Sequence, residues 1–398
     1  MSFGKERGLD RIADVSRRGS DMVTLWHDVF EIVEPLVPTY QGMCCFSLDP
    51  ASLLMTSHVN PGLSYPLPDA ALQGEYLYED VHDMASVARS PSAVSALHDA
   101  AGGDPSGSPR WLANMEMGGD QELLVALRTK SGAAWGCLGL YREPGRPRFD
   151  ATEQAFLRTV SPVLAEGVRR ALLIGEARDP DVPDAPGLLV LDEQLEVESA
   201  TPGTAHWVSQ LPGDGELPTA VIAVAGQALR TVDGVGEVAF ARTLTDSGAW
   251  VVLHGAPLSG GDRRRVAVIV EPAHPARITP LLMAAYGLTE REQEVTRRVL
   301  QGAATSEIAD ALVVSPHTVQ EHLKNIFEKT GVRSRRDLVG KVFFTYYEPR
   351  CATTSSASTT SVRFVAAPTV PRCRSRGAGG ASPAPGCCRS TTNASVVL

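Results

Sequence analysis

The segment LTEREQEVTRRVLQGAATSEIADALVVSPHTVQEHLKNIFEKTGVRSRRDLV (288–339) carries the start signals of several short helices. Thr289 followed by Glu292 is a capping box, in which the side chain of each residue accepts from the backbone N–H of the other. A second helix, EIADAL, follows shortly and is expected to be capped by Thr305 or Ser306. The spacing therefore predicts two short helices in succession.

A third helix begins at Ser315 and Pro316, since serine caps a first turn and proline at the first helical position loses no hydrogen bond. At 3.6 residues per turn its side chains divide between two arcs. The apolar arc holds Val319, Leu323, Ile326 and Phe327, and the polar arc holds His317, Gln320, Glu321, Lys324 and Glu328. Gly331 ends this helix, and Ser334 with Asp337 starts a fourth. One side of the third helix is expected to pack and the other to stay free.

Two short helices, a tight turn and a third helix with a polar outer face suit the major groove of DNA, which is wide enough to admit an α-helix. Basic residues gather late in the segment, which suggests an oriented surface that faces phosphates. They are Lys324, Lys329, Arg333, Arg335, Arg336 and Lys341. We therefore predict an all-α, four-helix helix-turn-helix domain at 284–348 that binds double-stranded DNA.

The segment also resembles the DNA-binding domain of the LuxR family over its whole length. The LTxREQEV opening, the GxxxxEIAxxLxVSxHTVxxH middle and the KxGVxSRxxL ending agree with that family in both residue type and spacing. The resemblance implies that Thr318, Gln320, Glu321, Lys324 and Asn325 face DNA, with Thr318 near phosphate, and that the last helix makes a dimer contact. The full set of residues expected to contact DNA is Ser315, His317, Thr318, Gln320, Glu321, Lys324, Asn325, Lys329, Arg335 and Arg336.

One position departs from the family pattern. Many members have Lys or Arg directly after the HTV triplet, whereas this chain has Gln320 followed by Glu321. Glutamine can read adenine and glutamate can accept from cytosine, so the preferred site would differ. Alternatively these side chains lie at the edge of the groove and read nothing. That reading leads to a second candidate function, a protein-interaction adaptor with a degenerate helix-turn-helix.

The first half of the chain shows the order helix, strands, helix. Apolar residues three or four apart predict one amphipathic helix over 10–37. Strands are expected at 42–48 and 52–58, a loop-rich stretch at 90–110, and a hairpin formed by 122–129 and 133–141. Asp150 and Glu153 form a capping box before a long helix that contains Pro162. This order describes a sheet flanked by helices.

A smaller unit follows a Pro- and Asp-rich linker at 178–187. Its pattern predicts two strands in 187–199, a helix over 217–230 and further strands up to Pro272. A second junction is expected at 271–280, because this segment holds three prolines. At 398 residues the chain is too long for one core, which agrees with several domains.

Both N-terminal regions resemble known sensory modules. ARSPSAVSALHDAAGGDPSGSPRW and SGAAWGCLGLYREPGRPRFDATE are similar to the GAF-like N-terminal region of LuxR-type regulators, and residues 186–272 look like a PAS-type module. The expected fold is thus multidomain: α+β sensory modules, GAF-like and then PAS-like, followed by the helix-turn-helix domain. The expected divisions are a GAF-like sensory or dimerisation domain at 1–178, a PAS-like domain at 186–272, the DNA-binding domain at 284–348 and a disordered tail at 349–398.

The GAF-like region is a candidate site for a small-molecule ligand. Tyr76, Trp111 and Trp135 are candidates to line its pocket, although such aromatic residues also commonly belong to a core. Cys44 and Cys45 are adjacent, and adjacent side chains on a strand point to opposite faces, so a shared metal is not expected. The seven cysteines include no CxxC pair and are expected to be reduced thiols.

The sequence contains no HExxH, GxSxG or Walker A pattern, so we expect neither an enzyme nor a cofactor or metal site. The rival from that class is an enzyme hidden in the GAF-like region. No apolar run reaches the roughly 18–20 residues that span a bilayer, and the basic N-terminus lacks an apolar segment behind it, so a cytoplasmic location without a membrane partner is expected. The formal charge of −9 requires that DNA binding come from a local surface.

The tail from Pro349 has six arginines, no lysine and no acidic residue, and shows no periodicity. It is either a basic arm or an unselected extension. The overall prediction is a transcriptional regulator that forms a homodimer and works with RNA polymerase. In it, a signal at the N-terminal modules would shift the DNA-binding domain between masked and exposed states.

Overall fold

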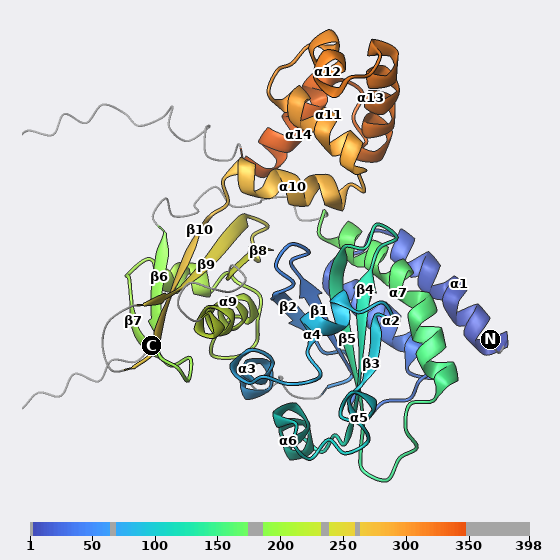
Figure 1. The fold of residues 1–398 in the computed structure, drawn as a ribbon, viewed down its shortest axis with the longest axis vertical. Helices are drawn as coiled ribbons and strands as arrows, with labels where there is room; N and C mark the ends of the chain where they lie inside the picture. Colours follow the sequence, from blue (N-terminus) through green and yellow to red (C-terminus); the bar gives the residue numbers. More distant parts are fainter. Residues whose placement is uncertain (1–2, 64–68, 174–185, 232–238, 259–262, 348–398) are drawn as a thin grey trace, which may run out of the picture. The chain divides into compact units, whose positions relative to one another are not determined.

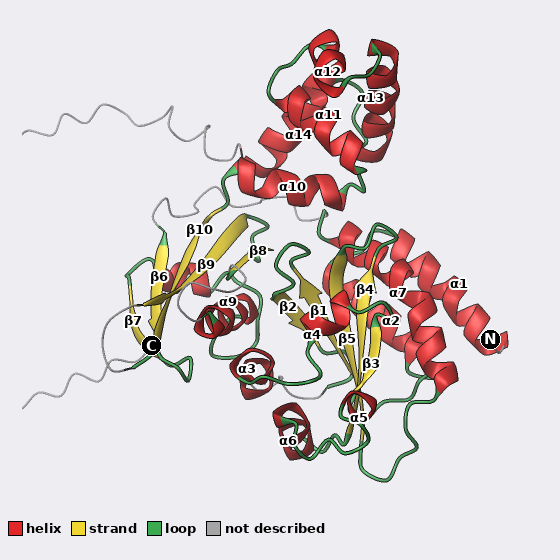
Figure 2. Ribbon diagram, viewed as in Figure 1, coloured by secondary structure: helices red, strands yellow, loops and turns green. Residues whose placement is uncertain are grey.

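The computed structural model describes residues 3–63, 69–173, 186–231, 239–258 and 263–347. Predictions that fall on the remaining residues, including most of the 178–187 linker and the tail at 349–398, lie outside the described residues. The elements form two antiparallel five-stranded sheets with their helices, followed by a helical C-terminal part (Figures 1 and 2).

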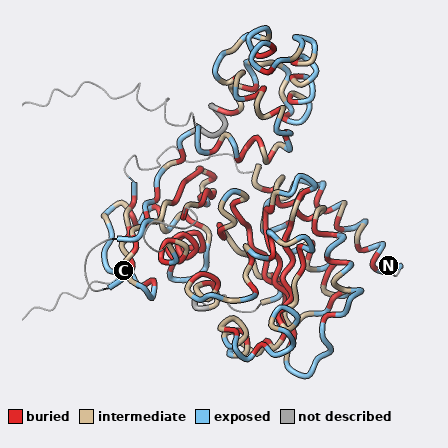
Figure 3. The backbone as a smooth tube through the Cα atoms, viewed as in Figure 1, coloured by how far each residue is buried: buried red, intermediate tan, exposed pale blue. Residues whose placement is uncertain are grey.

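The first sheet has the strand order β2-β1-β5-β4-β3. The hairpin predicted at 122–141 is confirmed as β4 and β5, which pair from Gln121↔Arg142 to Arg128↔Ala134. The strands are β1 (Met43–Leu48), β2 (Met55–Val59), β3 (Val94–Ala96), β4 (Gln121–Arg128) and β5 (Ala134–Arg142). Almost every residue of β1, β4 and β5 is buried, because helices cover both faces of this sheet (Figure 3).

Three helices cover one face of the first sheet, α1 (Phe3–Arg17), α2 (Met22–Val33) and α7 (Ala151–Ala171). The prediction of a single helix over 10–37 is wrong, because Gly19 adopts φ +70° and Asp21 caps a new helix by accepting from the Thr24 N–H at 3.0 Å. The capping box of Asp150 and Glu153 is confirmed at the start of α7, and Pro162 lies within this helix.

Short helices cover the other face of the first sheet. They are α3 (Asp69–Leu77), α4 (Met84–Arg89), α5 (Leu97–Ala100) and α6 (Pro109–Glu116). The loop expected at 90–110 is therefore in part wrong, since β3, α5 and the start of α6 fall within it. Such elements of three to eight residues have no periodicity to read, and β3 is a strand only because Val94 pairs with Val125 of β4.

The second sheet has the order β7-β6-β10-β9-β8, and α9 packs on it. The strands and the helix predicted between 187 and 272 are confirmed. The elements are β6 (Gly187–Leu191), β7 (Val197–Ala200), α8 (Thr204–Val208), α9 (Thr219–Arg230), β8 (Phe240–Leu244), β9 (Trp250–Leu258) and β10 (Arg265–Pro272). One buried cluster contains Cys44 and Phe46 of the first sheet together with Val221 and Leu253 around the second, so the two sheets share a hydrophobic core.

The junction expected at 271–280 is a helix instead, α10 (Pro275–Ala285). Pro275 stands at the N-terminus of this helix, where its missing N–H costs nothing, and Pro280 lies within it. Proline content alone predicts a linker, but the apolar residues Ile278, Leu281 and Leu282 are buried. Helix α10 leads directly into α11 (Glu290–Leu300), α12 (Thr305–Leu312), α13 (Pro316–Thr330) and α14 (Arg335–Tyr347).

The helical C-terminal part has a hydrophobic core of its own. Val295 of α11, Ile308 of α12, and Val319 and Ile326 of α13 are each fully buried. A cap forms one residue earlier than predicted, because Glu307 accepts from the Ala304 N–H at 2.6 Å and the helix already includes Thr305. The capping box of Thr289 and Glu292 is confirmed.

Candidate nucleic-acid interface

Helix α13 starts as its sequence predicts. The Ser315 hydroxyl accepts from the Thr318 N–H at 3.1 Å and lies 2.9 Å from the Thr318 hydroxyl, while Pro316 occupies the first helical position. Gly331 ends the helix in the left-handed conformation at φ +69°. These local bonds hold the first turn of α13 in place, with Ser315 exposed and Thr318 half-buried at its open end.

The two arcs of α13 differ in burial as expected. Val319, Leu323 and Ile326 are buried against α11 and α12. Of the predicted polar arc, His317, Gln320, Glu321 and Lys324 are exposed, and so is Asn325, which the family resemblance adds. These five side chains form what we call the outer face of α13, and none of them is covered by the described part of the chain. A helix of 15 residues presented in this way has the dimensions to enter a major groove.

Two of the predicted DNA contacts are engaged inside the protein. The Lys329 Nζ lies 2.6 Å from Glu292 Oε2, which joins the end of α13 to the start of α11. Arg335 donates to the Ala303 carbonyl and to the Thr305 hydroxyl, both at 2.9 Å. Both cations therefore hold helices together. Arg336 is exposed, and Lys329 is also exposed in spite of its bond to Glu292, whereas Arg335 is half-buried.

Glu292 therefore has two roles, as part of the capping box of α11 and as the partner of Lys329. Its burial favours the neutral acid, but the hydrogen bonds from Lys329 and Thr289 outweigh this effect and hold the pKa of Glu292 below its usual range. The capping box predicts the bond with Thr289, while no local signal predicts the pairing with Lys329, 37 residues away.

The turn between α12 and α13 contains a conformational outlier. Val313 adopts φ +55° and ψ +49°, the left-handed conformation that β-branched residues avoid, and its side chain is 91% exposed. The valine side chain therefore adds strain to the turn without filling any core.

We expect Val313→Gly and Val313→Asn to stabilise the helical C-terminal part by about 1 kcal/mol, since both residues tolerate this conformation. Denaturant unfolding followed by circular dichroism would measure the change. Val313→Ala is the matched control and should gain less, because alanine keeps a Cβ. A loss of stability in both the Gly and Asn variants would show that the turn is not strained.

The three aromatic residues predicted to line a ligand pocket are not brought together. Trp135 is 1% exposed and belongs to the core beneath α1, α2 and α7, while Tyr76 packs on the other side of the first sheet. The Trp111 indole donates to Asp120 at 3.0 Å. Sequence composition identified aromatic residues but not the face of the sheet to which each belongs.

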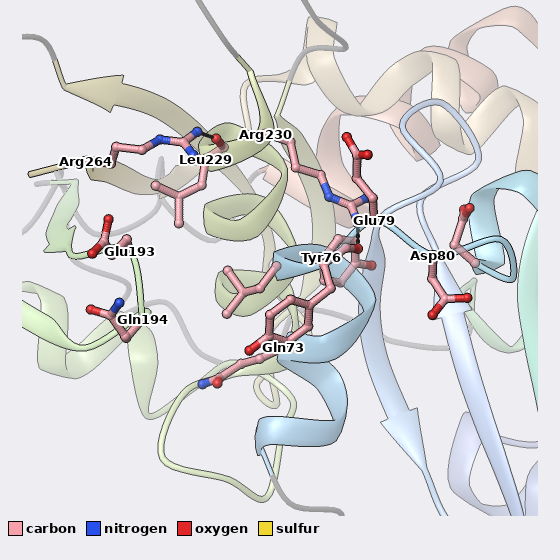
Figure 4. A pocket seen from close by; sticks show the side chains of 12 residues that line it. Gln73, Tyr76, Glu79, Asp80, Glu193, Gln194, Leu229, Arg230 and Arg264 are labelled. Atoms are coloured by element: carbon pink, nitrogen blue, oxygen red, sulfur yellow. Dashed lines mark hydrogen bonds between the residues drawn. The ribbon is translucent and has the colours of Figure 1, made fainter. Parts of the chain in front are cut away.

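Tyr76 does line a cavity of about 810 Å³ (Figure 4). Residues of α3 and of the loop after it form one wall, and residues of the β6–β7 turn, the end of α9 and Arg264 just before β10 form the other. The Tyr76 hydroxyl accepts from the Met55 N–H at 2.9 Å, so its polar end is already bonded within the protein. Most charged groups in the wall are acidic, namely Glu79, Asp80, Asp83 and Glu193.

A buried polar cluster that the sequence did not reveal lies between α6 and the first sheet. Arg110 pairs with Glu122 through two bonds of 2.6 and 2.8 Å and also contacts Glu75, and Asn114 donates to Glu122 at 3.1 Å. Burial raises the pKa of Glu75. Burial acts in the same direction on Glu122, but Arg110 outweighs it and lowers the pKa of that carboxyl. No sequence motif connects these residues, which come from three separate segments.

His82 borders this cluster and is 1% exposed, with Nε2 3.9 Å from Glu122. Burial lowers the pKa of His82 to about 4, from 6.5 in an unfolded chain. The folded state favours the neutral ring of His82. The stability that this residue contributes is therefore fully present above pH 6.5 and is lost as the pH falls toward 4.

We therefore expect the wild-type protein to lose about 2 kcal/mol of stability between pH 7 and pH 5 through this one residue. Chemical unfolding at both pH values should show the loss, and His82→Gln should show a smaller one. An equally steep pH dependence in His82→Gln would assign the effect to other groups.

The cysteines of the described residues are Cys44, Cys45 and Cys137, all buried and free. Cys44 and Cys45 belong to the clusters on opposite faces of the first sheet, which confirms the prediction that they diverge. In the part of the chain that the structure describes, no three His, Cys, Asp or Glu side chains group as a metal site. Nor do the described helices include one with the length and apolarity required to cross a membrane.

Comparison with known proteins identifies the C-terminal part alone. Residues 287–342 match the family described as "Bacterial regulatory proteins, luxR family". The transcriptional regulatory protein UhpA of Escherichia coli is 43% identical over 56 residues, which are 14% of this chain and 29% of that protein. The CsgBAC operon transcriptional regulatory protein of the same organism is 42% identical over 52 residues, 13% of this chain and 24% of that protein. The chain thus covers less than a third of either relative.

Solved structures resemble the chain only weakly. A dimer of Vibrio cholerae VqmA, described in connection with LuxR-type receptors, aligns with 40% of this chain and 81% of its own at 20% identity and a TM-score of 0.20. The chromophore-binding domain of a Stigmatella aurantiaca bacteriophytochrome aligns with 41% of this chain and 59% of its own at 13% identity and a TM-score of 0.27. These scores are too low to assign a shared fold. The matched family and the observed helices agree for the C-terminal part, and residues 287–342 are a helix-turn-helix domain of the luxR family of bacterial regulatory proteins.

Proposed function

We propose that this protein is a transcriptional regulator that reads double-stranded DNA with the outer face of α13. The observation that carries the proposal is the exposure of that face, with His317, Gln320, Glu321, Lys324 and Asn325 all accessible on a helix whose other side is buried. Ser315 and Thr318 at its first turn would meet a phosphate, since hydroxyls and helix N-termini commonly bind phosphate oxygens. Exposed Arg336 is a further phosphate contact in this proposal.

The four helices α11–α14 would act as one DNA-binding unit, with α14 as the dimer contact that the family resemblance implies. Two copies would then place two α13 helices in successive major grooves, ~34 Å apart. A homodimer on a palindromic site, acting with RNA polymerase in the cytoplasm, is the working assembly. Lys329 and Arg335 stay predicted DNA contacts, although their side chains are also bonded within the protein.

The two sheet regions would supply regulation, the first as a GAF-like and the second as a PAS-like module. Support comes from their order, an antiparallel sheet with helices in each, and from a cavity of about 810 Å³, within the usual range for small-molecule sites. In this conformation the outer face of α13 is exposed, which corresponds to the exposed state of the proposed equilibrium between masked and exposed forms.

Selection of bound sites from random duplexes with the purified full chain tests the proposal. We expect a palindrome to be recovered, and binding to it to weaken steeply with salt, because each neutralised phosphate contributes about one to the log–log slope. An absence of binding at low salt, in protein shown to be folded, would contradict the proposal. It would favour the adaptor alternative, for which the exposed Glu321 and Glu328 on α13 are the supporting feature.

A further inference from the structure

A buried ion pair joins two segments that are far apart in the sequence. Arg242 of β8 meets Asp49, at the end of β1, through Nε–Oδ2 and Nη2–Oδ1 distances of 2.8 and 2.6 Å. The Arg242 N–H also donates to Asp49, at 2.9 Å. The two side chains are 7% and 0% exposed. Burying both charges is costly, and removing either partner would leave an uncompensated charge, so this pair holds the first sheet tightly against β8.

The same guanidinium reaches the helix that leads to the DNA-binding domain. Arg242 Nη1 donates to the carbonyl of Arg277, in the first turn of α10, at 3.2 Å. The Arg242 side chain, carried by β8, therefore bonds to two other elements, the first sheet through Asp49 and α10 through the Arg277 carbonyl. At the other end of α10, Arg169 of α7 donates to the Ala285 carbonyl.

Helix α10 also belongs to two hydrophobic cores. Ile278, Leu281 and Leu282 are buried in the cluster that contains α7, which covers the first sheet. Met283, one residue further on, is 2% exposed and belongs to the core of the helix-turn-helix domain. Tyr286 packs against both clusters, and the Lys341 ammonium of α14 lies 5.2 Å from its ring centroid.

We propose that Arg242 and α10 form a rigid coupling element, through which the arrangement of the two sheets sets the position of the DNA-binding domain. The buried ion pair holds α10 at its start, Arg169 holds it at its end, and Met283 and Tyr286 transmit its position to α11 and α14. Arg242 is a positioning residue in this scheme and contacts no DNA.

The effect of this coupling on DNA binding rests on the proposed function. A dimer that must reach two half-sites together gains affinity in proportion to how well its two DNA-binding domains are held at the required spacing. Loosening α10 should therefore weaken binding to a two-site duplex and leave binding to a single half-site nearly unchanged. A signal that alters the contact between Asp49 and Arg242 would change DNA binding by the same route.

Hydrogen exchange in the wild-type full chain tests the coupling without any DNA. As denaturant is raised below the unfolding transition, the amides of α10 should open together with those of β8, as one cooperative unit. If α10 instead opens together with α11–α13 and independently of β8, the proposal is wrong. Because this measurement needs no substitution, it holds even if variants fold poorly.

A pair of variants separates coupling from stability. Asp49→Asn leaves Arg242 charged and buried and should lower the thermal midpoint. The double variant Asp49→Asn/Arg242→Met removes both charges and should recover most of that loss, because neutral replacements of a buried pair are often tolerated. The double variant still lacks the bond to Arg277, so exchange in α10 should be faster than in wild type by roughly tenfold. Glu143→Gln is the control, because it removes one acid from the exposed pair with Arg146.

Duplex binding completes the test. The double variant should bind a two-site duplex roughly tenfold more weakly than wild type and a half-site duplex equally well. If the double variant showed the same exchange rates in α10 and the same affinity for the two-site duplex as the wild-type protein, the coupling proposal would be overturned. Failure of the wild-type protein to bind any duplex would count against the proposed function instead, and the exchange experiment would still decide whether α10 is coupled to β8.

Discussion

Replacing Lys324 with glutamate is expected to weaken binding to duplex DNA by roughly 10–100-fold at low salt. Lys324 lies one turn after Gln320 on the outer face of α13 and is exposed, whereas the other lysine of this helix, Lys329, is paired with Glu292. A negative charge at position 324 would face the phosphates together with Glu321. Gel shifts at several salt concentrations measure the effect, and the milder Lys324→Ala should reduce the log–log salt slope by about one per bound chain.

Lys130→Glu provides the matched control. Lys130 lies in the exposed turn between β4 and β5 of the first sheet, and its substitution makes the same change in net charge. Binding should weaken little in this variant. Equal losses in Lys130→Glu and Lys324→Glu would show that overall charge, not the outer face of α13, sets the affinity.

Arg110→Met is expected to cause the largest loss of stability, about 3–5 kcal/mol, because it leaves two buried carboxyl groups without their cation. Glu122 is fully buried and Glu75 nearly so, and both bond to this guanidinium. Denaturant unfolding of the full chain, followed by near-ultraviolet circular dichroism, would register the change around the first sheet.

Two comparisons make this prediction specific. Arg146→Met removes a cation from an exposed pair with Glu143 and should change stability by less than about 0.5 kcal/mol. The triple variant Arg110→Met/Glu75→Gln/Glu122→Gln should recover part of the loss, because no buried charge then remains unpaired. If the free energy of unfolding of Arg110→Met equals that of the wild-type protein, the cluster does not carry buried charge in the folded protein.

Much of the helical C-terminal part could be predicted because its signals are local. The capping box at Thr289, the start at Ser315 and the stop at Gly331 each involve partners within about four residues, so they act before any tertiary contact forms. The alternation of apolar and polar side chains on α13 likewise determined which arc is buried. The same logic succeeded for the β4–β5 hairpin and the cap of α7.

Predictions that depended on composition alone were less reliable. Three prolines suggested a linker where α10 forms, because a proline near a helix start is tolerated and burial of the apolar face then stabilises the helix. The internal bonds of Lys329 and Arg335 could not be predicted either, since a basic residue gives no local sign of a partner elsewhere in the chain, and their contact with DNA stays a prediction. Tyr76 and Trp135 likewise gave no sign that they lie on opposite faces of one sheet.

The amino-acid sequence alone determined the helix-turn-helix of the luxR type and the polar, accessible face of its third helix. Periodicity and caps are properties of neighbouring residues, so they can be recognised without the tertiary structure. Only the tertiary structure decided which charges are internal. Asp49 meets Arg242 across 193 positions, and Arg110 gathers Glu75 and Glu122 from two other segments. Buried ion pairs form where folding brings opposite charges together away from water, and no spacing along the chain encodes that meeting.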